Sequence, residues 1–129
     1  MNGRLLIDTN IIIALFDSEY AVQQHLVEDI EIFTPAIALG EMYYGAYKSA
    51  RAKENIARID EFASLSVVLA CDSYTAQWYG QIKESLRKKG RPIPENDIWI
   101  AAIALQYDLI LITRDDHFDE IDGLNVQKW

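Results

Sequence analysis

Hydrophobic residues in this chain fall into short continuous runs separated by longer segments of helical periodicity. Residues 4–7 and 109–113 contain apolar runs without alternation, the pattern of strands buried on both faces of a sheet. Shorter blocks at 30–33 and 67–69 predict two more strands, and 125–127 predicts one at an edge. Because short strands alternate with helices, the sequence predicts an α/β fold with a mainly parallel sheet.

The segments between these strands carry helix signals. Thr34 is expected to be an N-cap and Pro35 the first residue of a helix that runs to about Lys48. Gly90 is expected to end a long amphipathic helix whose last turn is rich in basic residues. The helices predicted besides the one before Lys48 are 11–16, 19–28, 51–62, 72–89 and 95–107, with a single turn near 117–118.

Length and composition favour one domain spanning residues 1–129, without repeats or a linker. The single cysteine, Cys71, excludes an internal disulfide and fits a reducing compartment. The longest apolar run, 98–105, is too short to span a bilayer. We therefore expect a cytoplasmic protein that does not enter the membrane.

Charge is unevenly distributed. The net charge of −8 argues against indiscriminate nucleic-acid binding, which needs a basic face. Nine of the twelve basic residues nevertheless lie between Lys48 and Arg91, whereas eight acids from Glu95 onward face only Arg114 and Lys128. The pattern is compatible with a basic surface beside an acidic centre, or with two solvated helix faces.

Two aspartates follow predicted buried strands. Asp8 comes directly after the apolar run 5–7, and Asp115 comes shortly after 109–112. The carboxyl ends of parallel strands meet at one edge of a sheet, where ligands bind in open α/β folds, so both should reach the same place. Each also has a structural alternative: Asp8 as N-cap of the next helix, and Asp115 as cap of the turn holding His117.

Glu41 interrupts an apolar stripe of its predicted helix. Its neighbours three and four positions away are Ile37, Ala38, Tyr44 and Gly45. We therefore expect Glu41 to face the core or a cleft rather than open water, held by a cation or by a hydrogen bond to the backbone or a tyrosine.

Asp97 opens a helix that is apolar on all sides over 98–105, and shares its first turn with Glu95 and Asn96. The helix dipole favours negative charge there, so N-capping would explain one of these residues. The rigid loop 90–94 would fix the position of this acidic turn.

Four carboxylates brought together need a positive partner. Oxygen ligands without a cluster of Cys or His favour Mg²⁺ or Mn²⁺ over zinc. Such a site suits metal-assisted hydrolysis of phosphodiester bonds.

Four segments of the chain resemble the motifs of PIN-domain nucleases, in that family's order and spacing, from Leu5 to about Asp119. They are Asp-Thr-Asn-Ile-Ile-Ile at 8–13, Gly-Glu-Met-Tyr-Tyr-Gly-Ala at 40–46, Pro-Glu-Asn-Asp-Ile-Trp-Ile-Ala-Ala at 94–102 and Thr-Arg-Asp-Asp-His-Phe at 113–118. Within that family, a free-standing chain of this length is most similar to the VapC-type toxins of toxin–antitoxin pairs.

The resemblance implies a PIN-like three-layer α/β/α domain and an endoribonuclease that depends on Mg²⁺ or Mn²⁺. Its RNA substrate is expected to be tRNA or ribosomal RNA. It also implies a homodimer and a small antitoxin whose tail covers the acidic pocket.

The resemblance makes Asp8, Glu41, Asp97 and Asp115 the catalytic, metal-binding quartet. Asp8 and Asp97 are expected to be direct metal ligands, and Glu41 and Asp115 to complete the metal shell or orient the attacking water. Thr9 or Thr113 is expected to hold a ligand or a metal-bound water.

The fourth motif leaves one choice open, since Asp115 and Asp116 are adjacent. The family pattern, Thr followed by any residue and then Asp or Asn, favours Asp115. For His117 the resemblance implies a structural role.

Three other functions compete with this interpretation. A phosphotransfer receiver domain would use Asp72 as phosphoacceptor, but the chain offers no lysine at a late strand end. A catalytically idle PIN-like scaffold would bind a partner without cleaving RNA. A DNA-directed nuclease of the flap-endonuclease type would be longer and more basic.

Overall fold

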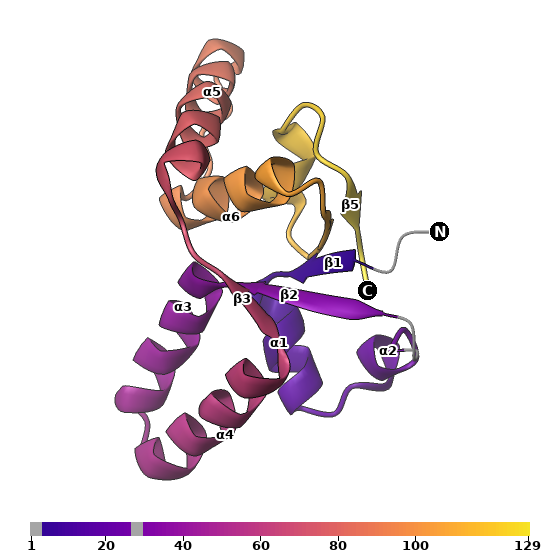
Figure 1. Cartoon of the computed structure of the whole chain (residues 1–129), viewed down its shortest axis with the longest axis vertical. Coiled ribbons are helices and arrows are strands. Elements are labelled where there is room, and N and C mark those ends of the chain that lie inside the picture. The colour runs from indigo at the N-terminus through magenta and orange to yellow at the C-terminus, as the bar shows by residue number, and fades with distance from the viewer. Residues whose placement is uncertain (1–3, 27–29) are drawn as a thin grey trace.

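Five parallel strands run through the middle of the molecule in the order β3-β2-β1-β4-β5 (Figure 1). The computed structural model describes residues 4–26 and 30–129. The strands are β1 (Arg4–Ile7), β2 (Glu31–Pro35), β3 (Val67–Leu69), β4 (Ile110–Ile112) and β5 (Val126–Gln127). The helices are α1 (Thr9–Phe16), α2 (Tyr20–Gln23), α3 (Ala36–Tyr47), α4 (Ala52–Leu65), α5 (Ser73–Lys89) and α6 (Glu95–Gln106), with a 3₁₀ helix η1 (Asp116–Glu120).

Helices cover both faces of the sheet, so the predicted three-layer α/β/α architecture and parallel sheet are confirmed. Leu6 and Leu111 pack with α5 and α6 on one face, whereas Leu5, Ile7 and Ile110 pack with α1 and α3 on the other. Successive side chains of a strand point to opposite faces, so a strand covered on both sides must be apolar throughout. This explains the continuous apolar runs.

Helix α6 lies inside the molecule, as its sequence predicts. Six of its residues are buried, namely Ile98, Ile100, Ala101, Ala102, Ile103 and Ala104. Its first turn therefore holds a fixed position relative to the sheet. Helices α3 and α4 instead form an antiparallel pair around Leu39, Ala46 and Ile59, which projects from the sheet (Figure 1).

The ends of α5 show why this segment is helical. Asp72 accepts hydrogen bonds from the amides of Tyr74 and Thr75, and the Thr75 hydroxyl accepts one from the Asp72 amide, which completes a capping box. Gly90 ends the helix in the left-handed region, with φ of +67°, a conformation that a residue without Cβ adopts at little cost. The predicted stop at Gly90 is confirmed.

The prediction that Thr34 caps the third predicted helix is wrong. Thr34 belongs to β2, is fully buried and pairs in register with Val68 of β3. Its hydroxyl lies 2.6 Å from the Ser66 hydroxyl, so it is engaged across the sheet. Pro35 occupies the N-cap position of α3 without any side-chain cap.

Two helix boundaries also differ from the prediction. Helix α1 begins at Thr9 because the Asp8 side chain caps it, two residues before the predicted start. The predicted helix 19–28 is represented by α2, Tyr20–Gln23, and its predicted end falls outside the described residues. Within 4–26 and 30–129, no helix combines the length and hydropathy needed to cross a membrane.

Candidate active site

Asp8 is buried directly after β1 and is held by three donors. Its Oδ1 accepts the Thr9 amide at 2.8 Å, and its Oδ2 accepts the Thr113 hydroxyl at 2.8 Å and the Asn10 side-chain amide at 3.4 Å. The predicted N-cap role is thus real, yet it uses only one carboxylate oxygen. Burial raises the pKa of Asp8, and the bonds from Thr113 and Thr9 oppose that rise.

Asp97 lies in the first turn of α6, with its side chain only 15% exposed. Its Oδ2 lies 3.1 Å from His117 Nδ1. Burial raises the pKa of Asp97; the bond to His117 opposes this, while the negative charges of Asp8 and Asp115 raise the pKa further. The three aspartates are therefore close enough to repel one another.

Asp115 caps η1, since its Oδ1 accepts the His117 amide at 3.0 Å. The same oxygen lies 3.0 Å from His117 Nδ1, so the imidazole contacts both Asp97 and Asp115. One ligand atom from each of these three residues can be chosen so that all lie within 4.8 Å of one another. The hydrogen bond to Asp97 is the largest of the effects that raise the pKa of His117, and the charge of Asp115 adds to it.

Glu41 is exposed on α3, so it does not face the core; of the two surroundings expected for it, the structure gives a cleft, since Glu41 lines the hollow that also contains Asp97. The apolar stripe around it is itself partly in solvent, with Tyr44 66% exposed, because α3 projects from the sheet. Glu41 still belongs to this edge of the sheet: its Oε1 accepts the Thr9 hydroxyl at 3.0 Å. Thr9 in turn donates its amide to Asp8.

An open hollow of about 480 Å³ unites three of the four predicted carboxylates. Its lining comprises Glu41, Pro94, Glu95, Asn96, Asp97, Asp115 and His117. Asp8 joins this group through Thr9 and Thr113 rather than through the lining. The structure thus brings together acids that are up to 107 positions apart in the chain.

Thr113 links the two aspartates that follow β1 and β4. It is fully buried, and its hydroxyl donates to Asp8 Oδ2 while accepting the Asp115 amide at 3.0 Å. Asn10 supports the same junction, since its side-chain amide lies 3.4 Å from the Thr113 hydroxyl and its Oδ1 accepts the Arg114 amide. Thr9 and Thr113, the two threonines expected to support the site, therefore each donate a hydroxyl hydrogen bond to an acid of the quartet.

Glu95 differs from the quartet because it already has a cation. Its carboxylate accepts the Tyr79 hydroxyl at 2.6 Å and the Lys83 ammonium at 2.9 Å, and these bonds lower its pKa. In the described part of the chain, no lysine or arginine forms an ion pair with any of the four quartet acids. Among the described residues, the basic side chain that contacts the quartet carboxylates is His117, whose Nδ1 lies close to Asp97 and Asp115 and which is cationic when protonated.

The side chains of Asp115 and Asp116 differ in exposure and in the residues they contact. The Asp115 side chain is 33% exposed and lines the hollow, whereas Asp116 is 91% exposed and pairs with Lys128 at 2.9 Å. Lys128 lowers the pKa of Asp116. The geometry therefore places Asp115, which the family pattern favours, in the hollow and Asp116 in solvent.

The predicted basic cluster at the end of α5 is partly neutralised. Arg87 forms a bidentate ion pair with Glu84, and Lys89 forms an ion pair with Asp122 at 2.7 Å. Of the two arrangements that the charge pattern allowed, these pairs favour solvated helix faces for Arg87 and Lys89.

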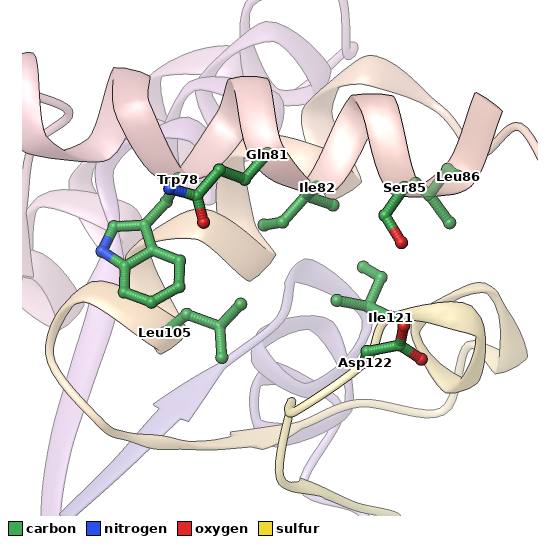
Figure 2. Close-up of a pocket in the computed structure, with 8 residues that line it drawn as sticks. All are labelled: Trp78, Gln81, Ile82, Ser85, Leu86, Leu105, Ile121 and Asp122. Atoms are coloured by element: carbon green, nitrogen blue, oxygen red, sulfur yellow. The ribbon is translucent and has the colours of Figure 1, made fainter. Parts of the chain in front are cut away.

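Figure 2 shows a second, smaller hollow between α5, the end of α6 and the segment after η1. Its volume is about 180 Å³, and its lining contains none of the four carboxylates. Trp78, Ile82 and Leu86 of α5 face Leu105 and Ile121 across it, so its walls are mainly apolar (Figure 2). It lacks the acidic character of the site beside Asp97.

Comparison with known proteins agrees with the fold. The PIN domain family matches residues 5–124, so the chain belongs to the PIN-domain family. This confirms the resemblance of the four motifs and rules out the receiver-domain interpretation.

Within that family, the similarity is to proteins named VapC. The chain is 33% identical to "Ribonuclease VapC2" of Haemophilus influenzae, with 98% of each chain covered. It is 31% identical to "tRNA(fMet)-specific endonuclease VapC" of Shigella flexneri, again with 98% of each covered. Among solved structures, the DNA-bound VapBC complex of Salmonella typhimurium matches with a TM-score of 0.89, 29% identity and 98% coverage of both chains.

The sequence predicted the quartet but not how His117 and Lys128 take part. His117 was expected to have a structural role, yet its ring lies between two quartet acids. The signal was its place two residues after Asp115, a spacing that also fits an ordinary capped turn. Lys128 carried no signal, since it contacts Asp115 and Asp116 only after β5 pairs with β4.

Proposed function

We propose that this chain is a metal-dependent endoribonuclease that serves as the toxin of a toxin–antitoxin pair. Asp8, Glu41, Asp97 and Asp115 form its catalytic centre, where RNA phosphodiester bonds are hydrolysed. The observation that carries the proposal is the convergence of these four acids at one sheet edge, with a histidine that contacts two of them, Asp97 and Asp115. The VapC ribonucleases, similar over nearly the full length, support the choice of RNA as substrate.

The residues present fit a divalent cation. Carboxylate oxygens suit Mg²⁺ or Mn²⁺, and ligand atoms of Asp97 and Asp115 lie within 4.8 Å of each other. The raised pKa of both Asp8 and Asp97 reflects burial first and then the negative charge of neighbouring acids, and a nearby cation would oppose both effects. When bound, the metal would lower the pKa of a water and stabilise the leaving oxygen.

The protein groups have separate tasks in this proposal. Asp8 and Asp97 would hold the metal, and Thr113 keeps Asp8 oriented through its 2.8 Å hydrogen bond. Asp115 would complete the metal shell. Glu41, at the exposed rim and bonded to Thr9, is placed to orient the attacking water and accept its proton.

The partners follow from the same relatives. The "tRNA(fMet)-specific" name of the Shigella flexneri protein favours tRNA as substrate class, with ribosomal RNA as the alternative. The VapBC complexes among the structural neighbours, one of them described as a member of the VapBC family of toxin–antitoxin systems, favour a small antitoxin as protein partner. We propose that this antitoxin covers the acidic hollow. We further propose one domain over residues 1–129, a homodimer and a cytoplasmic location.

Cleavage of total cellular RNA tests this function. Purified protein, free of antitoxin, is incubated with Mg²⁺ or Mn²⁺, and with EDTA as the metal-free arm. Discrete fragments that require metal and disappear with Asp8→Asn are expected, and end-mapping of the fragments then identifies the target. A folded protein that cleaves nothing under any of these conditions would favour the idle binding scaffold.

A further inference from the structure

Strand β5 reaches the acidic site through the segment that carries Asp115. It pairs in parallel with β4, and two backbone bonds fix the register: Leu111 amide to Asn125 oxygen at 2.8 Å, and Thr113 amide to Gln127 oxygen at 3.1 Å. The second bond ends the backbone ladder at Thr113. This is the residue whose hydroxyl orients Asp8.

Side chains continue the pairing beyond that point. Lys128 Nζ donates to the backbone oxygen of Asp115 at 3.1 Å and to Asp116 Oδ1 at 2.9 Å. In the other direction, Arg114 Nε donates to the backbone oxygen of Trp129 at 2.9 Å. Four hydrogen bonds therefore join residues 113–116 to residues 127–129.

Arg114 also connects the Asp115 turn to the segments around α1 and α2. Its guanidinium forms a second bond, to Glu19 Oε1 at 2.9 Å, just before α2. Its amide donates to Asn10 Oδ1 at 3.3 Å, in the first turn of α1. The turn that presents Asp115 is therefore held between β5 and the segment that follows β1.

We infer that β5 and residues 128–129 form a brace for the Asp115 turn, and that Lys128 is a positioning residue for the site. The inference rests on the function proposed above. By fixing the backbone oxygen of Asp115, Lys128 sets the direction in which that carboxylate leaves the turn. By pairing with Asp116, it holds the neighbouring acid in solvent, away from the hollow.

The ion pair of Lys128 is unsuited to a stabilising role. Lys128 is 40% exposed and Asp116 91% exposed, and exposed ion pairs contribute little to folding. A residue with a small effect on stability can still have a large effect on a metal centre, because groups that orient ligands tune metal affinity. The brace therefore predicts a loss of metal affinity without a matching loss of melting temperature.

Three variants separate the two hydrogen bonds of Lys128; its longer ion pair, with Asp119 at 3.9 Å, is unaffected by the change at Asp116. Lys128→Met removes the ammonium but keeps the apolar stem, and Lys128→Arg keeps a donor. Asp116→Asn removes the charged partner and leaves the contact with the Asp115 backbone oxygen in place. All three act outside the proposed quartet.

Two readouts are needed. The first is Mn²⁺ affinity by calorimetric titration, where Lys128→Met should raise the dissociation constant about tenfold, the lower end for changes in groups that orient ligands. The second needs no metal: hydrogen exchange of the Asp115 and His117 amides, each of which donates a 3.0 Å bond within the turn. These amides should exchange several-fold faster in Lys128→Met, while α5 amides stay unchanged.

The expected result is a loss in both readouts for Lys128→Met, partial or full recovery in Lys128→Arg, and near wild-type behaviour in Asp116→Asn. Unchanged Mn²⁺ affinity and unchanged exchange in Lys128→Met would overturn the brace, as would an equal loss in Asp116→Asn. If the wild-type protein binds no Mn²⁺, the proposed function fails, and amide exchange alone then decides whether the brace exists.

Discussion

The Thr113 hydroxyl donates a 2.8 Å hydrogen bond to Asp8 Oδ2, joining two buried residues that lie 105 positions apart. The Thr113 hydroxyl oxygen also accepts a hydrogen bond from the Asp115 amide, so one hydroxyl sets the relative positions of Asp8 and Asp115. It also links the ends of β1 and β4, adjacent strands of the sheet.

Thr113→Val tests this link, because valine has the shape of threonine without the hydroxyl. Asp8 then loses a hydrogen-bond donor, and the Asp115 amide loses its acceptor. We therefore expect the free energy of unfolding to fall by about 1–3 kcal/mol, the cost of unpaired buried groups. RNA cleavage should fall about 10- to 100-fold. Thr113→Ser, which retains the hydroxyl, is the matched control; equal loss in both variants would show that packing, not the hydrogen bond, is responsible.

Asp97→Asn should abolish cleavage without harming the fold. Asparagine removes one of three mutually repelling charges and keeps an oxygen that can accept from His117. We expect more than about a 100-fold loss of cleavage, beyond the effect typical of groups that only orient ligands. The melting temperature in metal-free buffer should be equal or higher. The N-cap position of α6 is Pro94, without a side-chain cap, so a variant that unfolds would show that Asp97 supports the fold by another contact and would contradict the site assignment.

Divalent cations should stabilise the wild-type protein by mass action, because they bind the assembled acids and not the unfolded chain. The gain in melting temperature should grow with Mn²⁺ concentration and should be much smaller in Asp97→Asn. An equal gain in both proteins would place the bound ions elsewhere.

The raised pKa of His117 predicts how the stability of the metal-free protein depends on pH. This pKa is raised in the folded protein, chiefly by the bond to Asp97, so the folded state holds the proton more tightly than the unfolded state. That stabilisation is complete below the ordinary histidine pKa and is lost as pH rises through the raised one. His117→Asn should flatten this part of the stability curve, measured by denaturant unfolding in EDTA; an unchanged slope would contradict the assignment.

The acidic centre and its backbone were predictable because their signals are local. The runs before Asp8 and Asp115 are apolar on both faces only where helices cover both sides of a strand. The apolar surface of α6 likewise required burial, which fixed Asp97 at its start.

Other features depend on contacts that no local pattern encodes. Thr34 and Pro35 form a good helix start, yet pairing of Thr34 with Val68 keeps Thr34 in the sheet. The stripe around Glu41 predicts that this face meets the core or a cleft, but α3 projects with α4, so that Glu41 lines an open hollow and its face lies partly in solvent. The local motif favours Asp115 over Asp116, but it does not encode the ion pair of Asp116 with Lys128, which reaches the turn only through the sheet.

The neighbouring acids Asp115 and Asp116 offer the most direct test of the central claim, a metal-dependent nuclease site at this sheet edge. Asp115→Asn and Asp116→Asn make the same chemical change at adjacent positions, one lining the hollow and the other in solvent. Cleavage of purified tRNA and ribosomal RNA is measured in Mn²⁺ for both variants and the wild-type protein. We expect Asp116→Asn to cleave like the wild type and Asp115→Asn to lose more than about 100-fold. Full activity in Asp115→Asn, or equal loss in both variants, would contradict the proposed site.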